Sequence, residues 1–285
     1  MLLKGIRVSS LLITLLICFL SGNFEGLRWL WVLPLTFVGI EALLIALAFG
    51  FLCLACRAVD ITVPQEHDSP FYRRLMNLYA EGAFDLLQTR LHTEGLEKIP
   101  TSGRFLVVSN HLDIMDPVLL ARFFPNSQLA FISKKENADM FLVGKVMHKT
   151  MCQMIDREND RAALRTIINC IRLIKEDECS VAVFPEGYTS MDVKLHHFRC
   201  GVFKIAIKAN VPIVVCTLQN TQNILRSAAR LKPVDAHLHV LGVIQPEEFA
   251  GKTAIQIGER VYDWMLSDLG PEYAPEEEAS QAVNT

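Results

Sequence analysis

The chain has 285 residues, enough for one sizeable folded domain with an appendage. Hydrophobic residues make up 51% and charged residues 21%, a composition that excludes intrinsic disorder and collagen-like structure. The formal net charge is −3, and the glutamates of the C-terminal residues 271–285 account for all of it. The rest of the chain is too nearly neutral for a general nucleic-acid binder, so we expect no nucleic-acid partner.

The first 60 residues are mostly apolar. One apolar run extends from Val8 to Leu20, and a second, of 24 residues, from Leu33 to Cys56. As a helix the second run would be ~36 Å long, enough to cross the hydrocarbon core of a bilayer, whereas the first is short for a span. The pattern predicts a membrane-associated helical hairpin over residues 1–60. It either spans the bilayer or enters one leaflet, and the short first helix favours the shallow version.

A cleaved signal peptide is the competing interpretation of the first run, because Lys4 and Arg7 precede it. Ser21-Gly22-Asn23 is a poor cleavage site, however, and a longer apolar run follows at once. Lys4, Arg7 and Arg57 flank the hairpin on one side, so the positive-inside rule predicts a protein of the cell membrane whose following domain faces the cytoplasm. Glu41, inside the second run, is expected to be protonated or to face water, with a polar contact on a lipid entry path as the alternative.

The cysteines and histidines give little indication of a metal centre. Eight cysteines lie mostly in apolar runs, as buried thiols do, and Cys53-x-x-Cys56 has the spacing of a redox pair but ends a membrane helix. The histidines of His196-His197 are adjacent, and those of His237-x-His239 alternate along a predicted strand, so both pairs favour structural roles. We expect a reduced, cytoplasmic environment and no bound metal.

A folded domain is expected over residues 61–270, followed by an acidic, disordered tail over 271–285. It opens with an amphipathic helix over Phe71–His92. Strand-like and helix-like segments then alternate. The predicted strands are Phe105–Ser109, Leu129–Ser133, Met151–Ile155, Ser180–Phe184, Ile213–Leu218 and His237–Val243, and the predicted helices are Pro117–Phe124, Met140–Lys149, Asp160–Lys175, Val202–Ala209 and Lys252–Leu266. The alternation predicts an α/β fold with a central, mostly parallel or mixed sheet flanked by helices, in which the loops leaving strand ends carry the chemistry.

The loop after the first predicted strand contains a histidine and a carboxylate that a turn can bring together. Pro117 disfavours helical backbone at Asp116, which makes Asp116 an N-cap and places His111 on the turn from strand to helix. In one continuous helix the two side chains would point ~140° apart, so the turn is needed for their contact. Such a pair could act as a general base and its orienter. Asp113 is a rival orienter, and a capping role for Asp116 without chemistry at His111 is the alternative.

Two further strand ends carry residues suited to binding. The strand Ser180–Phe184 ends at Pro185-Glu186-Gly187, where the proline terminates the ladder and the glycine lets backbone amides approach a ligand closely. An earlier strand leads into Asp156-Arg157, whose guanidinium suits a phosphate group.

Together and in this order, these segments resemble the four motifs of the glycerolipid acyltransferase family, which includes the 1-acylglycerol-3-phosphate acyltransferases. The matches are Asn110, His111 and Asp116 for N-H-x-x-x-x-D; Ile155-Asp156-Arg157 for the second motif; Phe184, Pro185, Glu186, Gly187 and Ser190 for F-P-E-G-T-R-S; and Val211–Val214 for V-P-I-V. The resemblance covers roughly His92–Leu218, and members of this family often carry an N-terminal pair of apolar helices.

The resemblance implies a membrane-bound enzyme that moves a fatty acyl group from an acyl thioester (acyl-CoA or acyl carrier protein) to the free hydroxyl of a lysophospholipid. The expected acceptor is 1-acylglycerol-3-phosphate and the expected product phosphatidic acid, with no cofactor and no metal. It further implies His111 as general base, Asp116 as its orienter, Arg157 and Glu186 as groups that hold the acceptor, and backbone amides near Gly187 as oxyanion donors.

One departure from the family pattern concerns the acceptor. Tyr188-Thr189 stands where the family usually has Thr-Arg, which removes a plausible phosphate contact. Lys194 or Lys134-Lys135 could compensate, or Arg157 could suffice, since phosphate accepts either cation. Alternatively, the acceptor is a different lysophospholipid or a glycolipid.

Two other classes of function remain open at this point. A metal-dependent hydrolase could use His111, Asp113 and Asp116, but would leave the other three motifs idle. An inactive membrane scaffold of the same fold could do without turnover, although it would be expected to lose His111 or Asp116, and both are present.

Overall fold

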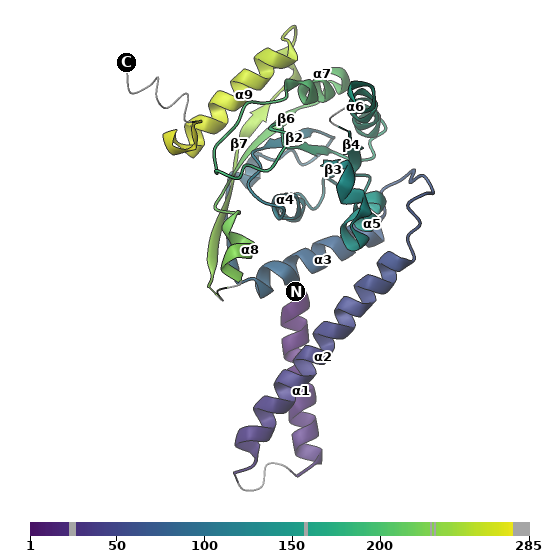
Figure 1. Ribbon diagram of the computed structural model, residues 1–285, viewed down its shortest axis with the longest axis vertical. Coiled ribbons are helices and arrows are strands. Elements are labelled where there is room, and N and C mark those ends of the chain that lie inside the picture. Colours follow the sequence, from purple (N-terminus) through teal and green to yellow (C-terminus); the bar gives the residue numbers. More distant parts are fainter. Residues whose placement is uncertain (23–26, 157–158, 229, 231, 276–285) are drawn as a thin grey trace.

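The computed structural model describes residues 1–22, 27–156, 159–228, 230 and 232–275. Two helices, α1 (Leu2–Leu20) and α2 (Trp29–Arg57), form a hairpin that projects from an α/β domain (Figure 1). The predicted fold class, a helix-flanked sheet preceded by an N-terminal two-helix hairpin, is confirmed. The boundaries 1–60 and 61–270 stay predictions. Of the predicted acidic tail, Pro271–Tyr273 forms a short 3₁₀-helix, and residues 276–285 lie outside the described residues.

Within the described residues, seven strands form one sheet in the order β1-β7-β6-β2-β5-β3-β4. The strands are β1 (Thr89–Glu94), β2 (Leu106–Ser109), β3 (Ala130–Lys134), β4 (Gln153–Ile155), β5 (Val181–Val183), β6 (Ile213–Gln219) and β7 (Val234–Ile244). Every neighbouring pair is parallel except β6 and β7. Because β2 lies between β5 and β6 and runs parallel to both, the loops that leave these three strands meet at one edge.

The structure corrects one expected element. The helix predicted over Phe71–His92 ends at Leu86 (α3, Pro70–Leu86), and β1 takes its last residues. Gln88 has a φ of 52°, so the backbone cannot continue the helix there. The leucines at this helix end suit a helix or a short strand equally. The strand forms here because β1 pairs in parallel with β7, which lies far along the chain. Local periodicity cannot predict such a long-range pairing.

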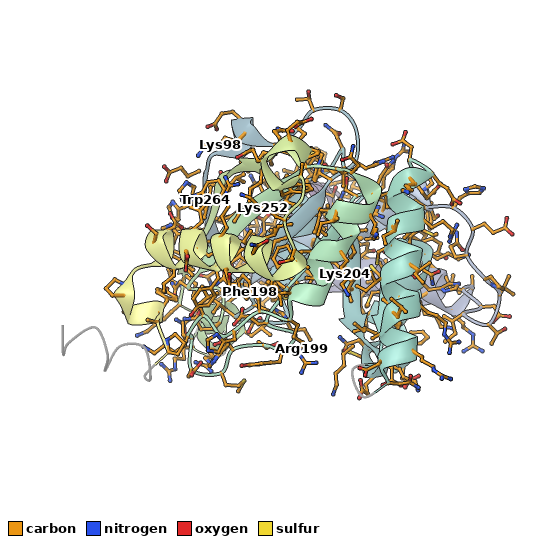
Figure 2. All side chains as sticks on the ribbon, turned by 90° about the horizontal axis from the view of Figure 1, so that it is seen from above. Lys98, Phe198, Arg199, Lys204, Lys252 and Trp264 are labelled. Carbon is orange, nitrogen blue, oxygen red and sulfur yellow. The ribbon has the colours of Figure 1, made fainter. Side chains whose placement is uncertain are left out.

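Helices cover both faces of the sheet (Figures 1 and 2). On one side lie α3, α4 (Asp116–Phe123) and α8 (Asn223–Ala228), and α5 (Phe141–Lys149) packs against α2 and α3. On the other side lie α6 (Asp160–Lys175), α7 (Lys204–Ala209) and α9 (Ala254–Leu269). Figure 2, seen from the side opposite the hairpin, labels Trp264 on α9 and also Phe198 and Arg199, which lie in the long loop that follows β5.

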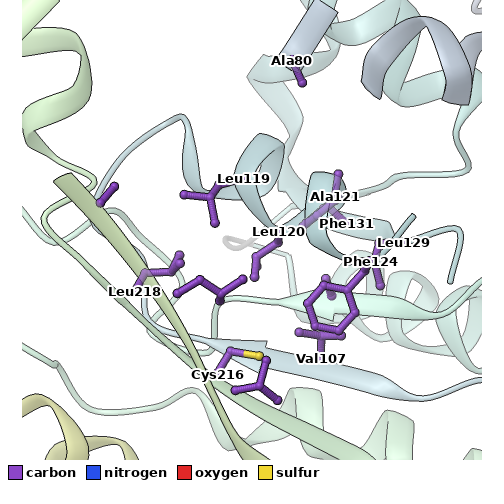
Figure 3. Packing of buried hydrophobic residues seen from close by; sticks show 14 of the residues in the cluster. Ala80, Val107, Leu119, Leu120, Ala121, Phe124, Leu129, Phe131, Cys216 and Leu218 are labelled. Carbon is purple, nitrogen blue, oxygen red and sulfur yellow. The ribbon is translucent and has the colours of Figure 1, made fainter. Parts of the chain in front are cut away.

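Each face of the sheet has its own apolar cluster. Beneath α4, Leu119 and Leu120 pack with Val107 of β2 and Leu218 of β6 (Figure 3). Leu106 and Val108, the neighbours of Val107 in β2, belong to the second cluster on the opposite face. Burial on both faces explains why β2 reads as a continuous apolar run. Packing on both faces also fixes the carboxyl end of β2, where the loop that carries His111 begins.

The hairpin is fastened to the domain along α3. Tyr72 and Tyr79 lie two turns apart on one side of α3 and donate hydroxyl hydrogen bonds to the carbonyls of Ala55 (2.9 Å) and Ala48 (2.6 Å) in α2. The terminal amino group of Met1 forms an ion pair, 2.7 Å long, with a glutamate of α3. The part of α2 that precedes Ala48 therefore extends away from the domain together with α1.

Glu41 has a partner that the sequence analysis left unnamed. Arg7 Nε of α1 donates to Glu41 Oε1 of α2 at 3.2 Å. Such pairing lowers the cost of placing either side chain in an apolar hairpin. The partner lies on the other helix, 34 residues away, where no spacing rule points to it.

Candidate active site

His111 and Asp116 are in contact at the carboxyl end of β2. His111 Nδ1 lies 2.9 Å from Asp116 Oδ2, which also accepts hydrogen bonds from the amides of Leu112 (2.6 Å) and Asp113 (2.8 Å). The Asp116 side chain is fully buried, whereas 17% of the His111 side chain is exposed. With the carboxylate accepting at Nδ1, the neutral imidazole is assigned the tautomer that leaves Nε2 as an acceptor.

The turn brings the pair together, but not through the predicted cap. Asp116 is the first residue of α4, Met115 is the N-cap, and the carboxylate accepts from amides of the preceding loop instead of helix amides. Asp113, the rival orienter, accepts from the Met115 amide at 3.0 Å, and burial raises the pKa of its carboxyl group. Asp116 is therefore the carboxylate that holds His111.

Asn110 fixes the start of the loop. Its side-chain amide donates to the Leu218 carbonyl at 2.9 Å and its oxygen accepts from the Leu218 amide at 2.7 Å. The side chain thus continues the β2–β6 ladder by imitating a backbone strand, and it is itself buried. Because Asn110 is held in this way, the backbone of the next residue, His111, leaves the sheet at a defined point.

Glu186 follows β5 and points into the protein. Its oxygens accept from the amides of His111 (2.9 Å) and His196 (3.1 Å), and only 1% of the residue is exposed. Burial raises the pKa of this carboxyl group to about 7, against the opposing effect of the two amide donors. Both oxygens are engaged by backbone amides, so in this structure Glu186 joins two loops rather than facing an acceptor.

The loop after β5 reaches His111 at three further points. The Phe184 ring stacks on the imidazole with ring centres 4.2 Å apart, and the Ser190 amide donates to the His111 carbonyl at 2.8 Å. The Thr189 hydroxyl lies 3.1 Å from Nε2. Sequence reasoning did not assign Thr189 a role; the only indication of one was that Tyr188-Thr189 departs from the family pattern.

Gly187 has a φ of 83°, which favours glycine, and its missing side chain makes room for Arg199. A Cβ atom there would lie 2.9 Å from Arg199 Cδ. The Arg199 side chain is exposed (Figure 2) and lies beside Gly187. Backbone approach to a ligand at Gly187 stays a prediction, and Arg199 is a nearby cation that the sequence pattern does not reveal.

Two of the other predicted cations, both among the described residues, have partners away from His111. Arg157 lies outside the described residues, so its contribution stays a prediction. Lys194 Nζ donates to the Glu272 carbonyl at 2.5 Å, and Lys134 forms a 3.2 Å ion pair with Glu136. Of the three lysines proposed to compensate for the third motif, Lys194 and Lys134 therefore have partners elsewhere in the protein, and compensation by Lys135 stays a prediction.

The remaining histidine pairs make local contacts. His196 pairs with Asp192 at 2.9 Å, His239 pairs with Asp268 at 2.6 Å, and His237 stacks on His92. Among the described residues, no group of three or more His, Cys, Asp or Glu side chains has the geometry to hold a metal ion. No observation in this part of the chain therefore favours the metal-dependent alternative.

Comparison with known proteins identifies the family. A family model described as Acyltransferase matches residues 90–219, the segment from β1 to the end of β6 that holds the site. Residues 90–219 are therefore an acyltransferase domain, and the predicted resemblance to glycerolipid acyltransferases, carried by the four motifs in order, is confirmed.

The curated proteins most relevant to this comparison are named for one activity. A 1-acyl-sn-glycerol-3-phosphate acyltransferase of Chlamydomonas reinhardtii is 29% identical over 208 residues, 70% of this chain and 60% of the relative. A probable 1-acyl-sn-glycerol-3-phosphate acyltransferase of Mycoplasma pneumoniae is 32% identical over 140 residues, 48% of this chain and 52% of the relative. The matched region thus spans between about half and three fifths of these relatives.

A solved structure shares the fold. The crystal structure of the 1-acyl-sn-glycerophosphate acyltransferase PlsC from Thermotoga maritima matches with a TM-score of 0.60 and 23% sequence identity, covering 92% of this chain and 95% of that chain. At this identity the likeness establishes a common fold over most of this chain.

The raised pKa of Glu186 predicts how the stability of the protein depends on pH. The pKa is raised from 4.5 to about 7, so the folded protein holds this proton more tightly than the unfolded chain. The resulting stabilisation is fully present below pH 4.5 and is lost as the pH rises through about 7. Between these pH values the free energy of unfolding of the wild type should fall by up to about 3 kcal/mol relative to Glu186→Gln, measured by denaturation in detergent micelles.

A matched control is Glu97→Gln, since Glu97 is exposed on a 3₁₀ turn remote from the site in sequence. Its stability should follow the pH profile of the wild type. Parallel profiles for wild type and Glu186→Gln would contradict the assignment of a raised pKa to Glu186.

Proposed function

We propose that the protein transfers a fatty acyl group from an acyl thioester to the free hydroxyl of a lysolipid, with 1-acylglycerol-3-phosphate as acceptor and phosphatidic acid as product. The single observation that carries this proposal is the His111–Asp116 pair, 2.9 Å apart at the end of β2, with the imidazole partly exposed. The names of the curated relatives support the same acceptor. The donor, acyl-CoA or acyl carrier protein, is a co-substrate, and the reaction as proposed uses no cofactor.

The proposed chemistry follows from what each group can do. An alcohol does not ionise at neutral pH, so His111 Nε2 removes its proton as the oxygen attacks the thioester carbonyl. The Asp116 carboxylate stabilises the imidazolium, and the imidazolium then returns the proton to the departing thiolate. The developing oxyanion needs hydrogen-bond donors, for which the backbone amides near Gly187 are the candidates. Glu186 and Ser190 contribute by holding the His111 backbone.

Phosphate in the acceptor would be held by arginine. Arg199 lies across Gly187 beside the third motif, which supplies a guanidinium where Tyr188-Thr189 leaves none. Arg157, from the second motif, would be the other cation. Two guanidinium groups suit a phosphate monoester because each can form two parallel hydrogen bonds with it. This arrangement supports a lysophosphatidic acid acceptor in spite of the departure from the family motif.

The hairpin would place the enzyme at the bilayer that contains its substrates. The helices α1 and α2 are long and apolar enough to cross a membrane. From Trp29 to Ala48, where α2 meets α3, the helix is ~30 Å long, which matches the hydrocarbon core. Arg28, Trp29 and Trp31 begin α2 at the tip, and such residues prefer an interface to the bilayer centre. We therefore propose that the hairpin spans the membrane, with the domain on the cytoplasmic face.

The function is tested by measuring acyl transfer from labelled acyl-CoA and acyl carrier protein to a panel of lysophospholipids and lysoglycolipids. We expect phosphatidic acid from lysophosphatidic acid, and we expect His111→Ala to lower turnover ~10²–10⁴-fold because the general base is gone. His67→Ala is the control, since the His67 side chain is 81% exposed and pairs with Glu178 instead. Product from another acceptor alone would reassign the substrate. Undiminished transfer by His111→Ala would refute the proposed mechanism, and no transfer from any donor would favour the inactive scaffold.

The membrane topology is tested by labelling single introduced cysteines with an impermeant thiol reagent on intact cells. Ser21→Cys, at the end of α1, should react from outside the cell if the hairpin spans the bilayer. Ser102→Cys, in an exposed loop of the domain, should react only after lysis, and the wild type gives the background from native cysteines. Protection of Ser21→Cys before lysis would favour insertion into one leaflet.

A further inference from the structure

The loop after β5, residues 184–199, is fully described by the structure and contains turns and bends but no helix or strand. Backbone groups in such a segment need hydrogen-bond partners from other elements if the segment is to keep one conformation. The last part of the chain supplies such partners, namely α9 and the C-terminal turn that follows it, Pro271–Tyr273. Tyr262 of α9 packs edge-on against Phe198 of the loop, with ring centres 5.3 Å apart.

Leu195 of this loop is bonded to both the C-terminal turn and α9. Its amide donates to the Tyr273 carbonyl at 2.7 Å, and its carbonyl accepts from the Tyr262 hydroxyl at 3.2 Å. Only 1% of this leucine is exposed, so partners within the protein have to satisfy its backbone groups. Next to it, Lys194 Nζ donates to the Glu272 carbonyl at 2.5 Å. The C-terminal part of the chain thus binds two consecutive residues of the loop.

The neighbours of this leucine connect the loop to His111. On one side, the Lys194 carbonyl accepts from the Ser190 hydroxyl (2.7 Å), and the Ser190 amide donates to the His111 carbonyl (2.8 Å). On the other side, the His196 amide donates to Glu186 Oε2 (3.1 Å), and Glu186 Oε1 accepts from the His111 amide (2.9 Å). Each polar group of the His111 backbone is therefore joined, through one further residue, to the part of the loop that the C-terminal turn holds.

We propose that the C-terminal turn and Tyr262 position the catalytic base. They hold the loop after β5, and the loop in turn holds the backbone of His111 where its ring, oriented by Asp116, meets the substrate. A displacement of about 1 Å of a reacting group can cost ~10²-fold in rate, even when the change that causes it lies far from the chemistry. The inference rests on the proposed acyl transfer and adds positioning residues to it, with the chemistry of His111 unchanged.

A positioning role has a kinetic signature of its own. Loosening the loop disturbs the chemical step, so it should lower kcat and leave the KM values of donor and acceptor nearly unchanged. A contact that only stabilises the fold would lower the amount of folded protein, and the folded molecules would keep their turnover. A contact with a substrate would raise the KM of that substrate instead. Turnover per folded molecule therefore separates the three roles.

The test compares full-length variants in acyl transfer. Tyr262→Phe removes only the hydroxyl bonded to Leu195, and Tyr273→Ala removes the half-buried ring of the C-terminal turn. Each should lower kcat ~5–50-fold with KM within about twofold of wild type. Tyr273→Phe keeps the ring and should retain the wild-type kcat. Tyr72→Phe is the matched control, because it removes a hydroxyl bond to a backbone carbonyl of α2 instead, and it should also retain the wild-type kcat.

Hydrogen exchange measured by mass spectrometry shows whether the loop is loosened in the same variants. In Tyr262→Phe and Tyr273→Ala, peptides covering residues 190–198 and 107–116 should exchange faster than in the wild type. The first peptide loses its partners in the C-terminal part of the chain, and the second contains His111, whose backbone bonds then open more often. Tyr72→Phe should leave the exchange of both peptides unchanged.

Two results would overturn the proposal. One is faster exchange over residues 190–198 with an unchanged kcat, since the loop would then be loose without effect on the base. The other is unchanged exchange over these residues in Tyr273→Ala, since the turn would then not hold the loop. His111→Ala, measured in parallel, separates this inference from the proposed function. Transfer that still depends on His111 would leave the proposed function intact in both cases, whereas transfer unaffected by His111→Ala would remove both.

Discussion

The site depends on how the backbone of one residue, His111, is held between two loops. Its amide donates to the buried Glu186 carboxylate and its carbonyl accepts from the Ser190 amide. The loop after β5 therefore binds both polar groups of the His111 backbone. Adjacent parallel pairing of β2 and β5 makes this possible, because it brings the ends of both strands to one edge. With the backbone fixed, a single carboxylate, Asp116, is enough to set the orientation and tautomer of the ring.

The same packing links the site to the hairpin. Asp116 opens α4, whose Leu119 and Leu120 share an apolar cluster with Ala80 and Phe84 of α3. The hairpin is hydrogen-bonded to α3 through Tyr72 and Tyr79, so the two apolar helices, α3 and the loop that carries His111 form a continuous packed series. Such an arrangement would keep the histidine at a constant distance from the bilayer, where a lysolipid acceptor and its product reside.

Sequence reasoning succeeded where the determinants are local. The turn at Asp116-Pro117 predicts the histidine–carboxylate contact, and alternating apolar segments predict every strand except β1. It failed where a contact joins distant segments. The pairing of β1 with β7, the Arg7–Glu41 ion pair, and the inward orientation of Glu186 all depend on residues far apart in the chain. The Thr189–His111 contact belongs to this class, as it joins positions 78 residues apart.

The most direct test of the account is to measure kcat/KM for acyl transfer in Asp116→Asn and Asp113→Asn against the wild type. The account predicts that Asp116→Asn lowers kcat/KM ~10²–10⁴-fold, because the imidazolium loses its stabilising charge and the ring its fixed tautomer. Asp113→Asn should cost less than about tenfold, because the Asp113 side chain bonds the Met115 amide and not the imidazole. Near-wild-type activity in Asp116→Asn, or an equal loss in both variants, would contradict the assignment of Asp116 as the group that orients the base.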